Sequence, residues 1–115
     1  MKLKKLVSSY DEINDRFVGK IEGTKGYLLS YAISNNVFLN LDKNKYPSSI
    51  FIENASEVLN TSKEELKYSN IKIIIDCNAL FVHFNLFIDD LKSHSFKTRN
   101  THNISNSNII IDNSV

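Results

Sequence analysis

The strongest pattern in the chain is a strict alternation of apolar and other residues between positions 71 and 88. Every second residue on either side of a short break is apolar, namely Ile71, Ile73, Ile75, Cys77, Leu80, Val82, Phe84, Leu86 and Ile88. Because alternate side chains of a strand lie on one face of a sheet, each half predicts a strand with one buried face. A tight turn at Asn78 and Ala79 brings the two apolar faces together. The segment therefore predicts an antiparallel β-hairpin.

A second alternating pair spans residues 27–41. A two-residue turn would pair Ile33 with Phe38, whereas a three-residue loop over residues 34–36 pairs Ile33 with Val37. Only the three-residue loop keeps the apolar residues of both strands on one face, because a slip of one residue inverts every side chain. The predicted pairs are Ile33 with Val37, Tyr31 with Leu39 and Leu29 with Leu41.

Shorter patterns place the remaining elements. Residues 17–21 and 49–53 alternate in the same way, and residues 3–9 do so more weakly. Between residues 54 and 69 the pattern is helical. Two pairs of residues have the spacing of a helix start, Asn54 with Glu57 and Thr61 with Glu64. Two short helices with a break near residue 60 fit these signals better than one continuous helix.

Together these elements predict an α+β fold. Its parts are an antiparallel β-meander over residues 17–53, one short helical segment that can divide in two, and a C-terminal β-hairpin. From residue 97 onward the chain is rich in Asn, Ser and Thr, which predicts a disordered tail with room for one late strand at residues 109–111. The expected division is one domain over residues 1–96 and a tail over residues 97–115.

Length, charge and cysteine usage exclude several classes of protein. A chain of 115 residues holds one domain. Its 14 Lys and Arg against 13 Asp and Glu give a net charge of +1, which leaves no basic footprint for nucleic acid or anionic lipid. Cys77 is the only cysteine, and no apolar run approaches the roughly 20 residues that span a bilayer. The sequence predicts a cytoplasmic protein with neither nucleic acid nor membrane as a partner.

Two groups of residues contain possible metal ligands, but neither group has the sequence pattern of a known metal site. The histidines are His83, His94 and His102. They lie eleven and eight residues apart, whereas paired zinc ligands are typically about two to five residues apart. Asp42 and Glu53 have the separation of calcium-loop ends, but Pro47 stands where that loop needs glycine. We expect neither a metal nor any other cofactor.

The sequence offers no arrangement for catalysis. Cys77 has no base among its strand neighbours, so it is better interpreted as a small buried apolar residue. Asp11, Glu12 and Asp15 form an acidic turn, and such residues usually cap turns for local reasons. Three glycines are too few for a phosphate-binding loop. The sequence therefore predicts a protein that is not an enzyme.

The face of the predicted hairpin opposite its apolar stripe carries the most informative side chains. They are Ile74, Phe81, His83 and Phe87. One helical segment cannot cover both faces of a sheet, so these residues need another cover. Either the C-terminal tail or a second layer covers them within the monomer, or they form an interface with another subunit or partner. We take these four residues as the candidate interface.

Two motifs resemble a known family. YDEINDRF at residues 10–17 has an early Tyr-Asp followed by a second Asp, and LDKNKYPSSIFIENAS at residues 41–56 has a loop Asp, two strand isoleucines and an Ala-Ser helix start. Over residues 3–88 the chain resembles the small prokaryotic domain of unknown function catalogued as family 2283. Ser49 stands where that family usually has glycine, and Phe51 where it usually has glutamate. The resemblance implies a compact α+β domain without established activity, sometimes an antitoxin-like partner of a small toxin.

Three functions are therefore weighed. The first is a non-catalytic protein-interaction module that forms a homodimer or holds a partner such as a toxin. The alternative is a small-molecule sensor that binds its ligand between helix and sheet. The third is a hydrolase, for which no nucleophile and base stand together in the sequence.

Overall fold

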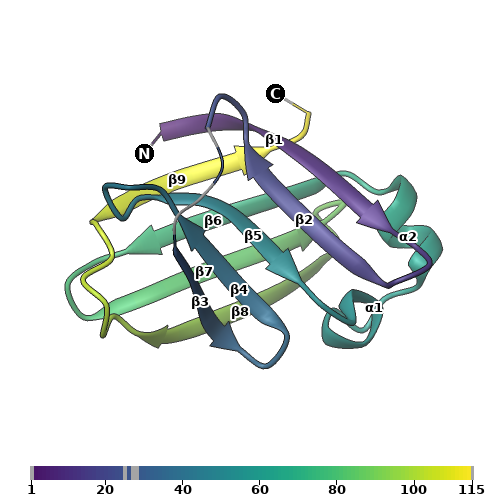
Figure 1. Cartoon of the computed structure of the whole chain (residues 1–115). Helices are drawn as coiled ribbons and strands as arrows, with labels where there is room; N and C mark the ends of the chain where they lie inside the picture. Colours follow the sequence, from purple (N-terminus) through teal and green to yellow (C-terminus); the bar gives the residue numbers. More distant parts are fainter. Residues whose placement is uncertain (1, 25, 27–28, 115) are drawn as a thin grey trace.

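Nine strands wrap around one apolar interior in the computed structural model, which describes residues 2–24, 26 and 29–114 (Figure 1). The elements of this described part are β1 (Lys2–Asp11), β2 (Arg16–Ile21), β3 (Leu29–Ser34), β4 (Val37–Leu41), β5 (Pro47–Ile52), α1 (Ala55–Val58), α2 (Lys63–Tyr68), β6 (Ile71–Cys77), β7 (Phe81–Ile88), β8 (Lys92–Arg99) and β9 (Ser107–Asp112). The strands follow one another in the order β3-β4-β5-β2-β1-β9-β6-β7-β8. The predicted start of the second hairpin, at residue 27, lies outside the described residues.

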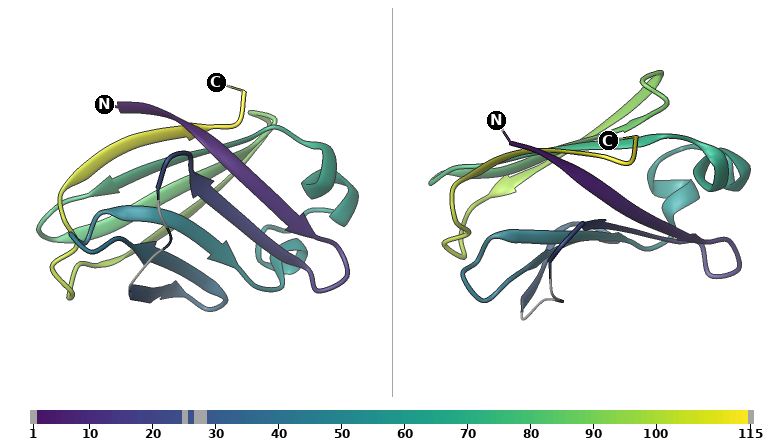
Figure 2. Two further views of the ribbon diagram at one scale, coloured as in Figure 1. Left: turned by 45° about the horizontal axis from the view of Figure 1, so that its top comes forward. Right: turned by 90° about the horizontal axis from the view of Figure 1, so that it is seen from above.

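The predicted α+β class is wrong, because the chain forms a nearly closed, barrel-like sheet with 56 % strand and 9 % helix. β1 is the reason. Its residues 2–5 pair in parallel with β9, and its residues 6–11 pair in antiparallel with β2. One long strand thereby joins two sheets into a single structure, as Figure 2 shows where β1 passes from one layer to the other. We call β2–β5 the first wall and β6–β9 the second wall.

The predicted disordered tail is instead part of the second wall. Residues 97–99 end β8, and residues 107–112 form β9 between β1 and β6. Ile109 and Ile111 of β9 and Ile104 before it are buried. The domain therefore does not end at residue 96. The optional late strand at residues 109–111 does form, as part of β9, but the disorder predicted from the polar composition around it is wrong, since the partners of β9, β1 and β6, hold the segment in the sheet.

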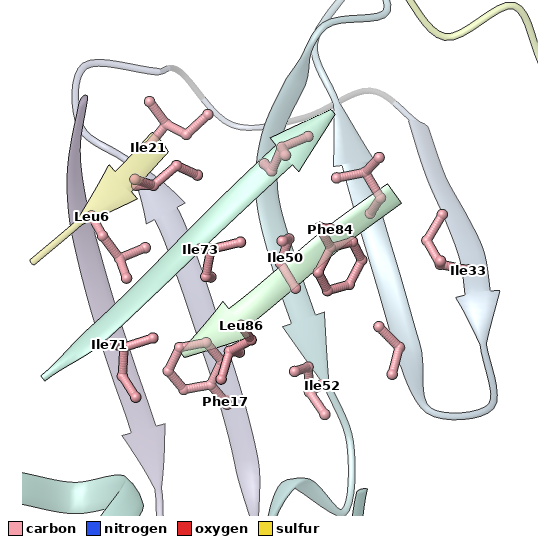
Figure 3. Close-up of a cluster of buried hydrophobic side chains, with 14 of the residues drawn as sticks. Leu6, Phe17, Ile21, Ile33, Ile50, Ile52, Ile71, Ile73, Phe84 and Leu86 are labelled. Atoms are coloured by element: carbon pink, nitrogen blue, oxygen red, sulfur yellow. The ribbon is translucent and has the colours of Figure 1, made fainter. Parts of the chain in front are cut away.

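The interior is filled by alternate side chains from both walls (Figure 3). Ile50 of β5 and Phe84 of β7 are both fully buried, and each belongs to a different wall. The walls approach closely at Gly19, where an added Cβ would lie 3.2 Å from the Cδ1 atom of Ile73. A side chain at this position would have to displace its neighbours, so glycine permits the close packing here.

The shared apolar face of β6 and β7 is confirmed, but the predicted turn at Asn78 and Ala79 is too short. Cys77 pairs with Val82 rather than with Leu80, so Ile73 lies opposite Leu86 and Ile75 opposite Phe84. Leu80 is the exception: it lies in the turn before β7 and is 70 % exposed.

In β3 and β4 the predicted pairs Leu29 with Leu41 and Tyr31 with Leu39 are confirmed. The predicted pairing of Ile33 with Val37 is wrong. Ser34 occupies that place, because the register shifts between Ala32 and Ser34. The irregularity adds one residue and lets Ile33 stay buried beside a short turn.

Two short helices with a break between them are confirmed, and they cap one end of the barrel (Figure 1). The predicted capping residues, Asn54 and Thr61, are not confirmed. The side chain of Asn54 makes no capping hydrogen bond, and Ser62 rather than Thr61 accepts from the Glu65 backbone N–H, at 3.0 Å. Within the described residues, no helix has the length and apolar character to cross a membrane.

Candidate functional site

The candidate interface residues lie together on the outer face of the second wall. Ile74 is on β6, and Phe81, His83 and Phe87 alternate along β7 with its buried residues. Phe81 is 36 % exposed, and the other three are half-buried. The strand alternation therefore placed all four on the expected face.

The C-terminal segment does not cover this face. β8 pairs with one side of β7 and β9 with one side of β6, so both strands extend the wall within its own plane. Figure 2 shows no second layer outside this wall among the drawn elements. Of the two explanations considered for the aromatic residues, cover by the tail is thus excluded for the described part of the chain.

Two lysines partly shield the aromatic rings. The Nζ atom of Lys97 lies 4.3 Å from the ring centroid of Phe81, and that of Lys72 lies 4.9 Å from the centroid of Phe87. Lys72 also pairs with Asp90 at 2.9 Å. Such cation–π contacts at exposed sites contribute about 0.5–1 kcal/mol. Each of the two rings is therefore paired with a lysine ammonium of the same wall.

Charged residues are ordered across this wall. Asp76 of β6 pairs in register with His83 of β7, which in turn pairs with Lys97 of β8. Asp76 and Lys97 are both exposed. His83 hydrogen-bonds Ser95 of β8, with 2.7 Å between Nε2 and Oγ. The row therefore changes from acidic to basic over three adjacent strands, and we call it the charged row.

The acidic turn between β1 and β2 has a structural task. Asp15 accepts hydrogen bonds from the Tyr10 hydroxyl at 2.6 Å and from the Ser56 backbone N–H at 3.0 Å and hydroxyl at 2.6 Å. Its own carbonyl accepts from the Ala55 N–H at 2.9 Å. The turn is thereby fixed to the start of α1, a long-range role that the prediction of purely local capping missed.

Hydrogen bonding also sets the ionisation of this turn. Burial alone would raise the pKa of Asp15, but the hydrogen bonds from Ser56 and Tyr10 outweigh burial and hold that pKa below its ordinary value. Burial and the Asp15 carboxylate both raise the pKa of the Tyr10 hydroxyl. Asp11, which accepts from the side chain and backbone of Asn14, also has a lowered pKa. Lowered pKa values favour the charged form of both carboxylates, and both already accept hydrogen bonds from neighbouring residues. This suits a role in holding the turn in place rather than in proton transfer.

The other residues weighed as metal ligands or catalytic groups do not form a site. One oxygen of Asp42 accepts from the backbone N–H groups of Asn44 and Tyr46, at 2.8 and 3.0 Å, so it closes a turn. His102 stacks on Tyr31 of β3 with ring centroids 4.0 Å apart, whereas His83 bonds Ser95 on the outer face of the second wall. Across residues 2–24, 26 and 29–114, no cluster of His, Cys, Asp and Glu has the geometry to hold a metal. Cys77 is buried, and that burial raises the pKa of its thiol.

The first wall carries a feature that the sequence interpretation missed. Its outer face is hollowed over β2, β4 and β5 into a cavity of about 620 Å³. Val18, Phe38 and Phe51 form apolar walls, and Asn40 and Ser49 supply polar groups. These residues occupy the outward positions of strands whose inward residues are fully apolar. The sequence carries no distinct signal of it, since Asn40 and Ser49 stand at ordinary outward positions of strands.

Comparisons of the chain with protein-family models, with curated proteins and with solved structures give no match. The resemblance to family 2283 therefore stays a prediction.

Proposed function

We propose that the protein is a cytoplasmic, non-catalytic binding domain that forms a two-fold homodimer through the outer face of β6, β7 and β8. The charged row is the observation that carries this proposal. The lone buried thiol of Cys77 suits a reducing compartment. An antitoxin-like role would rest on the family resemblance alone and is not part of the proposal.

A two-fold axis running along β7 between two facing copies accounts for the charged row. Such an axis places β6 of one copy over β8 of the other, since rotation exchanges the two sides of the central strand. Asp76 of each copy then faces Lys97 of its partner, so both ends of the row gain an opposite charge. The same surface is used twice, as a two-fold interface requires.

The apolar residues supply the affinity in this arrangement. Phe81 and Phe87 lie on the central strand and are brought against the equivalent strand of the second copy. Burying a phenylalanine is worth about 1.5–3 kcal/mol relative to exposure. A standard interface covers about 800 Å² on each partner, about an eighth of the 6610 Å² accessible surface of this chain.

The test is sedimentation of the purified protein with serine in place of both aromatic residues. Phe81→Ser with Phe87→Ser should leave a folded monomer and weaken the dimer at least about 100-fold. The matched control, Phe38→Ser with Phe51→Ser, makes the same change on the outer face of the first wall and should leave the dimer intact. If the unmodified protein sediments as a monomer at micromolar concentration, the proposal is wrong.

A further inference from the structure

The cavity on the first wall contains a polar pair that strand packing does not require. Asn40 and Ser49 are in register on β4 and β5, and they are only 6 % and 8 % exposed although they point away from the barrel interior. The Asn40 amide donates to the Ser49 hydroxyl, with 2.8 Å between Nδ2 and Oγ. Ser48 bonds the Asn40 backbone carbonyl rather than its side chain, at 3.1 Å.

This arrangement leaves half of the Asn40 amide without a partner. A primary amide has two N–H donors and one carbonyl acceptor, and a single donor is used by Ser49. Among the described residues, nothing else bonds the second N–H or the carbonyl Oδ1 atom. The Asn40 Oδ1 atom is not among the fully buried side-chain atoms that lack a partner in the described part of the chain, so it is reached from the cavity. This free edge of the amide therefore offers a donor and an acceptor to whatever enters the cavity.

The walls around that edge are aromatic. The rings of Phe38 and Phe51 lie 6.0 Å apart between centroids and are inclined at 46°. Val18 borders the same space. Aromatic side chains of this kind stack on flat heterocycles. The volume of about 620 Å³ also falls in the ordinary range for small-molecule sites.

We infer that this cavity binds a flat nitrogen heterocycle with a hydrogen-bond donor beside an acceptor, of the adenine type, held edge-on by Asn40 and stacked by Phe38 or Phe51. An asparagine amide can make two hydrogen bonds with adenine: its carbonyl accepts from the exocyclic amine, and its N–H donates to the ring nitrogen. Lys20 lines the same cavity and is exposed. Glu53 also lines the cavity but pairs with Arg16 at 3.2 Å, so Lys20 is the cation that would favour a ligand carrying a phosphate.

The first experiment titrates adenosine into the full-length protein and follows the side-chain amide signals of Asn40 by NMR. Purine riboside, which lacks the exocyclic amine, is the matched ligand. Adenosine should shift the Asn40 signals at submillimolar concentration, and purine riboside should bind at least about tenfold more weakly because one of the two hydrogen bonds is missing. Adenosine monophosphate should bind more tightly than adenosine, and Lys20→Gln should remove that difference.

Two variants separate recognition from folding. Asn40→Leu keeps the size of the side chain and removes both hydrogen-bonding groups, so a folded variant should lose adenosine binding. Asn40→Asp keeps the size of the side chain and a hydrogen bond with Ser49, whose hydroxyl then donates to the carboxylate, but it has no N–H donor; it should weaken adenosine binding at least about tenfold, which covers the case in which the leucine variant does not fold. Equal affinity for adenosine and purine riboside would overturn the inference, as would an unmodified, folded protein whose Asn40 signals do not move at millimolar adenosine.

Discussion

The outer faces of the two walls each present a pair of phenylalanines, but they differ in what lies beside them. On the first wall, Phe38 and Phe51 have the short side chains of Asn40 and Ser49 as neighbours, and a hollow results. On the second wall, long lysine side chains lie over the rings of Phe81 and Phe87. Strand alternation decides which residues point outward. The size of their neighbours across the strands decides whether the surface becomes a cavity or a broad face.

Both walls belong to one barrel because β1 joins them, pairing with β2 of the first wall and with β9 of the second. Ile111 of β9 is fully buried, whereas the adjacent Ile110 points outward and is half-buried. Ile111→Asp should abolish the cooperative thermal transition, because it places an unpaired charge in the interior of a protein with only about 5–15 kcal/mol of stability. Ile110→Asp should leave the transition in place, as measured by circular dichroism.

The same two variants can also contradict the claim that β9 belongs to the core of the barrel. A cooperative transition in the Ile111→Asp variant, at the temperature of the unmodified protein, would show that β9 is not part of the core. It would also support the interpretation, suggested by composition, that residues 107–112 belong to a disordered tail.

A smaller effect is expected at the helical end, where Asp15 fixes the β1–β2 turn to α1 and so to the connection between the walls. Asp15→Asn keeps a residue that tolerates the positive φ of 53° at this position and removes the charge. It should lower the free energy of unfolding by about 2 kcal/mol, or roughly 10 °C in Tm for a domain of this size. Thermal unfolding at pH 7 measures this.

The pH dependence of that loss identifies its cause. The folded pKa of Asp15 lies below its unfolded value, so its contribution is complete above the unfolded pKa of about 3.9 and is lost as the pH falls through the folded pKa. The stability difference between the unmodified protein and Asp15→Asn should therefore shrink steadily on acidification below about pH 5. A difference that stays constant down to pH 2 would mean that the charge of Asp15 contributes nothing.

The parts of the molecule that sequence alone could predict are those with local partners. The shared face of Ile73 and Leu86 follows from alternation, and so does the outward position of Phe81, although the exact register does not. The late strand at residues 109–111 was foreseen only as an option inside a disordered tail, because it is short, lies in a polar context and pairs with β1, more than 100 residues away in sequence. Periodicity carries no information on such pairing, and without it the closed barrel cannot be recognised.

The candidate sites divide in the same way. The face of the second wall was predictable, because alternation along one strand defines it. The cavity was not, since Asn40 and Ser49 fit the polar positions of ordinary strands. Their burial and their shared hydrogen bond depend on the register between β4 and β5, which only the structure supplies.

The proposed two-fold arrangement is tested most directly by exchanging the charges at the ends of the charged row. Asp76→Lys and Lys97→Asp should each be monomeric alone, because each places like charges opposite one another twice, and such contacts are strongly unfavourable. An equimolar mixture of the two variants should sediment as a heterodimer, since every facing pair then has opposite charges. If each variant alone remains a dimer, or the mixture stays monomeric while the unmodified protein dimerises, Asp76 does not face Lys97 of a second copy and the proposed interface is wrong.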